Sequence, residues 1–152
     1  MKARLAASAA LALGIVVGAS GCSMITYQAT TEVYDPSDGL AANVGELDLR
    51  NILVVMEDGG DDGNLVFTVA NSGDDAELTA EPASGDPVTL EVGANEQVVL
   101  GGSGEEPLLL VGIDATPGGM LDIYFHADGA EGVEISVPVL DGRLPEYRDL
   151  VP

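Results

Sequence analysis

The stretch that decides the fold is "MLDIYFHADGAEGVEISVPV", residues 120–139. Apolar and polar residues alternate on both sides of the turn-forming sequence "DGAEG" at 128–132. Because successive side chains of a strand point to opposite faces, Leu121, Ile123 and Phe125 are predicted to face inward. The inward set of the second strand is Val133, Ile135, Val137 and Val139. The stretch is therefore predicted to form a β-hairpin with one buried face.

The opposite face of the same hairpin is mostly polar. Asp122, Tyr124 and His126 fall at its outward positions on the first strand. Pro138 falls at an outward position of the second strand. Because proline has no N–H to donate to a neighbouring strand, Pro138 predicts that the second strand lies at an edge of its sheet.

Similar short apolar or alternating runs, separated by Gly, Asp, Asn and Pro clusters, extend back to residue 44, and none has a helical period. The predicted strands before the hairpin cover residues 46–56, 65–71, 77–81, 87–92, 96–100 and 107–113. About eight strands over about 100 residues are typical of a β-sandwich or barrel. A domain of this size buries enough apolar surface to fold without disulfides.

The N-terminus has the three parts of a secretory signal. Lys2 and Arg4 precede an uncharged apolar run from Leu5 to Gly21, which ends in small residues. A membrane-spanning helix needs about 20 apolar residues, so this Ala- and Gly-rich run favours a signal peptide over a stable span. The predicted organisation is a signal peptide at 1–21, a flexible tether at 22–42, a β-sandwich domain at 43–140 and an extended tail at 141–152.

The single cysteine, Cys22, directly follows this run. The preceding Ala19, Ser20 and Gly21 resemble the lipobox of bacterial lipoproteins, in which the chain is cut before the cysteine and the thiol carries diacylglycerol. The resemblance implies cleavage between Gly21 and Cys22, and a covalent lipid on Cys22 as the only cofactor. Two acyl chains are enough for lasting attachment, here to the extracytoplasmic face of the cytoplasmic membrane. An ordinary secretory signal or an uncleaved anchor are the alternatives.

Acidic residues dominate the charge. The formal net charge is -21, with 26 Asp and Glu against 5 Lys and Arg. After cleavage, the only strong cations are Arg50, Arg143 and Arg148. We expect no nucleic-acid partner, because phosphates require a basic patch. The acidity also disfavours docking on anionic lipid, and it is equally consistent with adaptation to a salty habitat.

Three segments together resemble the secreted copper-chaperone family PCuAC. They are "LVFTVANSGDDAELTA" at 65–80, "VTLEVGANEQVVLGGSGEEPLLLVGI" at 88–113, and the closing hairpin. The segments "ANVGELDLRNILVV" at 42–55 and "LPEYRDLV" at 144–151 resemble the LpqE-like subgroup of actinobacterial lipoproteins. The resemblance implies a Greek-key β-sandwich, cupredoxin-like or immunoglobulin-like, and an envelope protein related to copper(I) delivery.

The copper ligands that the resemblance implies are missing. Aligning the glycine of the family's His-x-Met-Leu-Met-Gly-Leu strand with Gly112 places the histidine on Pro107 and the methionine on Leu109. The other His and Met should lie between residues 70 and 87, yet residues 57–119 contain neither residue type. Copper(I) is a soft ion that requires such thioether and imidazole ligands. We therefore expect the scaffold without its metal site.

The remaining metal candidates are Met56, Met120 and His126. Met120 and His126 are six residues apart on one predicted strand, which separates them by roughly 20 Å. We therefore expect Met56 in the core or at a strand end and His126 to be solvated. The acidic loop "EDGGDDGN" at 57–64 has oxygen ligands suited to calcium, but not the spacing of an EF-hand, and a solvated turn is the simpler interpretation.

Catalysis is not expected. After cleavage the chain has one histidine, no lysine and no free thiol, and no serine is marked as a nucleophile. The predicted function is a non-catalytic binding or accessory lipoprotein that meets a protein or cell-wall partner. The alternative is copper(I) delivery by other ligands. The tail at 141–152 either recruits a partner by strand addition or lies on its own domain.

Overall fold

The computed structural model describes residues 2–19, 35–102 and 104–152, with side chains in the first segment described to residue 15. The chain divides into two compact units, Met1–Tyr34 and Asp35–Pro152. The first unit contains helix α1, Lys2–Ala19, on the predicted signal peptide. Within the described residues, no helix combines the length and hydropathy of a membrane span. Gly21, Cys22 and the predicted tether as far as residue 34 lie outside the described residues.

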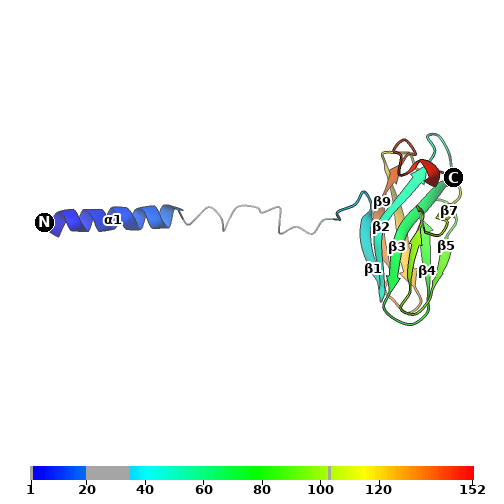
Figure 1. Ribbon diagram of the computed structural model, residues 1–152, viewed down its shortest axis with the longest axis horizontal. Helices are drawn as coiled ribbons and strands as arrows, with labels where there is room; N and C mark the ends of the chain where they lie inside the picture. Colours follow the sequence, from blue (N-terminus) through cyan, green and yellow to red (C-terminus); the bar gives the residue numbers. More distant parts are fainter. Residues whose placement is uncertain (1, 20–34, 103) are drawn as a thin grey trace. The chain divides into compact units, whose positions relative to one another are not determined.

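The second unit is an all-β sandwich of nine strands, which confirms the predicted class (Figure 1). The hydrogen-bonded order is β5-β4-β8-β9-β2-β3-β6, with β1 paired to β2 and β7 to β3. The strands are β1 Leu40–Val44, β2 Leu47–Met56, β3 Gly63–Asn71, β4 Ala76–Pro82, β5 Val88–Val92, β6 Gln97–Leu100, β7 Leu108–Leu110, β8 Met120–Ala127 and β9 Val133–Leu140. All strands of the described residues, and both of their apolar clusters, lie within residues 35–152, which are therefore a self-contained folding unit.

The predicted hairpin is β8 and β9. They pair antiparallel, with Leu121 opposite Val137 and Ile123 opposite Ile135. The alternation of burial along β8 confirms the predicted inward face. The edge-strand prediction from Pro138 is wrong, because β9 also pairs parallel with β2. That pairing begins only at Val139, so Pro138 precedes the parallel ladder.

Strand β1 was not predicted, because residues 40–42 were assigned to the tether and the first predicted strand began at residue 46. Its sequence, "LAANV", has neither alternation nor several β-branched residues, so it has no strand signal of its own. It is held by pairing with β2 across an irregular register. Asn51 has φ 55° at this irregularity, and its Oδ1 accepts a hydrogen bond from the Gly39 N–H at 3.1 Å. Tertiary contacts therefore create β1.

The main core is formed by inward residues from all nine strands. Phe67 and Phe125 are 1% and 0% exposed, and their rings meet edge to face with centroids 6.3 Å apart. This confirms the inward position predicted for Phe125. Edge-to-face contact adds about 1 kcal/mol to the burial of two such rings.

The C-terminal residues pack on the domain and are not an extended tail. A short 3-10 helix, Arg148–Leu150, brings Leu150 onto the outer side of β2 and β3 (Figure 1, red). There it forms a second apolar cluster with Leu53, Val55 and Val66. Of the two predicted alternatives, the segment at 141–152 therefore lies on its own domain. Burial of Leu150, which is 8% exposed, favours this packing over an extended tail in solvent.

Two polar contacts hold this C-terminal segment in place. The Asn64 Nδ2 donates to the Leu150 carbonyl oxygen at 2.9 Å. The Tyr147 hydroxyl donates to the Asp38 carboxylate at 2.5 Å. Burial, followed by this hydrogen bond, raises the pKa of Tyr147 to about 12. The contact between Tyr147 and Asp38 therefore joins the C-terminal segment to the first residues of the domain.

Candidate functional site

Two of the positions that the sequence resemblance assigns to PCuAC copper ligands lie on and just before β7. Leu109 is 46% exposed at the outward position of this short strand, and Pro107 is half-buried just before it. Gly112 follows with φ 70°, a conformation that favours glycine. The two expected ligand positions therefore present only carbon, which binds no copper ion.

The acidic turn between β2 and β3 has a structural use. The Asp62 Oδ1 accepts a hydrogen bond from the Gly112 N–H at 3.1 Å, and the Asp61 carbonyl oxygen accepts one from the Ile113 N–H at 2.8 Å. The turn thus anchors the chain that leaves β7. Among the described residues, no three His, Cys, Asp or Glu side chains are grouped closely enough to hold a metal ion.

The three alternative metal candidates do not converge. Met56 is 0% exposed and belongs to the main core, as predicted. Met120 is 56% exposed at the start of β8, on its outward face. The His126 side chain is 36% exposed near the other end of β8, where its Nε2 lies 3.4 Å from the Glu81 carboxylate. One ion cannot bind all three side chains of a single chain.

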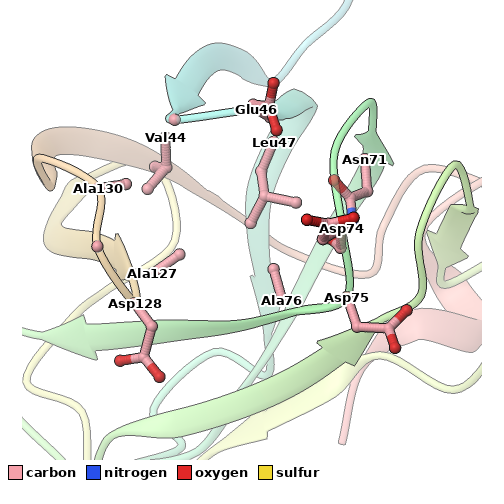
Figure 2. A pocket seen from close by; sticks show the side chains of 12 residues that line it. Val44, Glu46, Leu47, Asn71, Asp74, Asp75, Ala76, Ala127, Asp128 and Ala130 are labelled. Atoms are coloured by element: carbon pink, nitrogen blue, oxygen red, sulfur yellow. Dashed lines mark hydrogen bonds between the residues drawn. The ribbon is translucent and has the colours of Figure 1, made fainter.

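A cavity of about 270 Å³ lies at the end of the sandwich where three connections meet (Figure 2). They are the β1–β2 turn, the β3–β4 loop and the β8–β9 turn. Its lining residues are Val44, Gly45, Glu46, Leu47, Asn71, Asp74, Asp75, Ala76, Ala127, Asp128, Gly129 and Ala130. The Asp75 and Asp128 carboxylates lie on different sides of it in Figure 2. The cavity thus has a small apolar wall and a dispersed acidic rim, which disfavours anionic ligands.

Asn71 is the buried polar residue of this cavity, at 5% exposure. Its Nδ2 donates to the carbonyl oxygens of Asp74 at 2.6 Å and Gly93 at 3.0 Å, and its Oδ1 accepts from the Gly73 N–H at 2.9 Å. These bonds fix the β3–β4 loop. They also occupy the amide, so Asn71 shapes the cavity and is not a free ligand group.

Three arginines follow residue 22, and all three are exposed; Arg50 and Arg143 are paired with carboxylates. Arg50 lies 3.2 Å from the neighbouring carboxylate of Asp48. Arg143 lies 3.1 Å from Asp141 and 3.6 Å from Asp58. Exposed pairs of this kind contribute at most about 1 kcal/mol. They provide no concentrated basic patch for nucleic acid.

No protein-family model matches the sequence, and no curated protein matches it. Several solved structures resemble the fold, and three of them are PCuAC domains. An apo PCuAC domain of PmoF2 has a TM-score of 0.58 and 15% identity, covering 69% of this chain and 98% of that one. A copper-bound PCuAC domain of PmoF2 has a TM-score of 0.56 and 16% identity, and the match covers 67% of this chain and 98% of that one. An apo PCuAC domain of PmoF1 has a TM-score of 0.51 and 14% identity, and the match covers 66% of this chain and 98% of that one. At these identities the likeness concerns the fold, and this chain has a PCuAC-like β fold.

Proposed function

We propose that the protein is a lipid-anchored, extracytoplasmic binding module that uses a PCuAC-like β-sandwich without the copper site. In this proposal Cys22 carries the lipid, and the domain acts without catalysis on a protein or cell-wall partner. The signal-like N-terminus and the small residues before Cys22 support the anchor. The fold likeness supports the scaffold.

The observation that carries the proposal is the exposed Leu109 on β7, where the resemblance expects a methionine. Its side chain is 46% exposed, so a ligand at this position would reach solvent and an ion. The position of Leu109 is therefore accessible enough to bind a metal ion, but its side chain has no donor atom for one. Pro107, at the expected histidine position, has no nitrogen donor in its side chain.

A second candidate function is copper(I) delivery through Met56, Met120 or His126. Because Met56 is buried in the core, Met120 and His126 are the accessible candidates. The likeness to a copper-bound PCuAC domain favours it. Met120 and His126 are both accessible, but they lie roughly 20 Å apart along β8. Copper would therefore have to bind between two copies of the chain, through Met120 of one and His126 of another.

A copper(I) titration separates the two functions. Residues 35–152 would be titrated with Cu(I) against a chromophoric chelator under reducing conditions. We expect no competition, because the soft donors do not converge. A tight complex that is lost in both Met120→Leu and His126→Ala would establish the delivery function. The Met24→Leu variant of a longer chain, residues 23–152, controls for the remaining methionine.

The lipid anchor has an independent test. In Cys22→Ala, we expect the mature-length protein to leave the membrane fraction or the precursor to stay uncut, because the thiol is the site of acylation and defines the cut. Metabolic labelling with a palmitate analogue should mark the unchanged chain and not the variant. A labelled variant, or a mature-length variant that still sediments with membranes, would contradict the anchor.

A further inference from the structure

The outward side of β8 has an apolar and aromatic strip surrounded by carboxylates. Met120 is 56% exposed and Tyr124 is 39% exposed, and the His126 side chain is 36% exposed. We call this strip, together with the carboxylates of Glu81, Asp122 and Glu134, the β8 face. It is an open sheet surface, separate from the end cavity and from β7.

Strand register places the carboxylates around Tyr124. Glu81 on β4 is directly opposite Tyr124, and Glu134 on β9 is opposite it on the other side. In the adjacent outward row, Thr79 is opposite His126. Directly opposite residues lie about 5 Å apart at their Cβ atoms. The Tyr124 ring is therefore positioned between two carboxylates.

The carboxylates on β4, β5, β8 and β9 are not neutralised by strong cations from these four strands. The sequences of β4, β5, β8 and β9 contain no lysine or arginine. Next to the β8 face, Glu77 is directly opposite Glu91. A hydrogen bond with Glu91 and then repulsion by its charge raise the pKa of Glu77. Like charges opposite each other are unfavourable, and a bound cation would relieve the repulsion.

The Tyr124 ring is held in place by its neighbours. Its centroid is 5.5 Å from that of His126, with the ring planes tilted by 31°. At the hydroxyl end of the ring, a Cβ added at Gly132 would overlap the Tyr124 hydroxyl, so this end of the side chain lies against the glycine. Glycine at this position lets the ring pack along the backbone. The aromatic surface is thus ordered before any ligand arrives.

We infer that the β8 face binds a basic segment of a partner protein, with an ammonium or guanidinium group over Tyr124 and between Glu81 and Glu134. Tyrosine attracts cations through its ring, and carboxylates on both sides add charge complementarity. The aliphatic part of a lysine or arginine can cover Met120. The inference rests on the proposed function as a binding module, and it specifies the chemistry of the partner.

Charge decides against other occupants. A second copy of the chain carries the same net charge of -21, so two β8 faces repel each other. An anionic membrane surface is repelled for the same reason. A metal ion is disfavoured because the described residues have no group of three ligand side chains. A basic polypeptide can place its cationic groups over the aromatic strip and next to the carboxylates.

The test is a titration of isotopically labelled residues 35–152 with a decapeptide of alternating arginine and glycine, followed by amide chemical shifts. We expect saturable shifts concentrated on β4, β8 and β9. Glu81→Gln with Glu134→Gln should weaken binding about tenfold. Glu105→Gln with Glu106→Gln removes the same charge from exposed positions elsewhere and should change the affinity less than about twofold.

The aromatic contribution has its own variants. Tyr124→Leu should weaken binding about threefold, whereas Tyr124→Phe, which keeps the ring, should bind as the unchanged domain does. Equal losses from both Glu double variants, shifts spread over all acidic loops, or no shifts at all would overturn the inference. So would stronger binding of a neutral oligosaccharide to the same residues. None of these outcomes affects the copper titration, so the proposed function is judged separately.

Discussion

Leu150→Ala is expected to lower the free energy of unfolding of residues 35–152 by about 3 kcal/mol. Leu150 is 8% exposed and completes the outer cluster with Leu53, Val55 and Val66. Truncation removes its own burial and leaves space over three apolar side chains of β2 and β3. Urea denaturation followed by far-UV circular dichroism measures the change, since the chain has no tryptophan.

Leu144→Ala is the matched control for this variant. Leu144 is 50% exposed in the same C-terminal segment, so its truncation should cost no more than about 0.5 kcal/mol. If both variants cost the same, or if Leu150→Ala leaves the unfolding midpoint unchanged, the segment does not stabilise the domain. That result would restore the extended tail.

The titration of Tyr147 gives a second readout of the same segment. Its pKa in the folded domain is raised from 10.0 to about 12. Burial, and then the hydrogen bond to Asp38, raise this pKa, so the protonated hydroxyl contributes stability that is fully present below pH 10 and is lost as the pH rises through 12. If Leu150→Ala detaches the segment, the absorbance of tyrosinate should show that the pKa of Tyr147 falls back toward 10.0.

The sequence predicted the parts of the fold that carry their own pattern. The alternation of β8 fixed its inward face, and the turn before β9 fixed the hairpin. Strand β1 and the packing of Leu150 were not predicted, because both depend on contacts with β2 that no local pattern records. The edge position inferred from Pro138 failed because a proline restricts only its own N–H, not the rest of the strand.

The candidate sites divide in the same way. The absence of donors at Pro107 and Leu109 depends on residue type and could be read from the sequence once an alignment was assumed. The β8 face depends on register, since Glu81 and Tyr124 are neighbours only because β4 pairs with β8. Their separation in the chain hides this pairing from any local pattern. In the sequence, Glu81 and Tyr124 each look like any other exposed residue of a strand.

Asn71→Ala is the second variant with a large expected effect, a loss of about 3 kcal/mol in the free energy of unfolding. The side chain is 5% exposed and bonds to the backbone of Gly73, Asp74 and Gly93. Alanine leaves these groups without their partner in a partly enclosed site. The β3–β4 loop should loosen, and the Gly73 amide should lose its protection against hydrogen exchange.

Two further variants distinguish the lost hydrogen bonds from lost packing. Asn71→Asp keeps the size and the acceptor for the Gly73 N–H, but it places a carboxylate against the carbonyl oxygens of Asp74 and Gly93. We therefore expect it to destabilise the domain at least as much as alanine at pH 7. Ser72→Ala removes an exposed hydrogen bond to Glu46 in the same loop and should cost less than about 1 kcal/mol. If Asn71→Asp were as stable as the unchanged domain, the amide donors would not hold the loop, and the shape of the cavity would have to depend on its apolar wall instead.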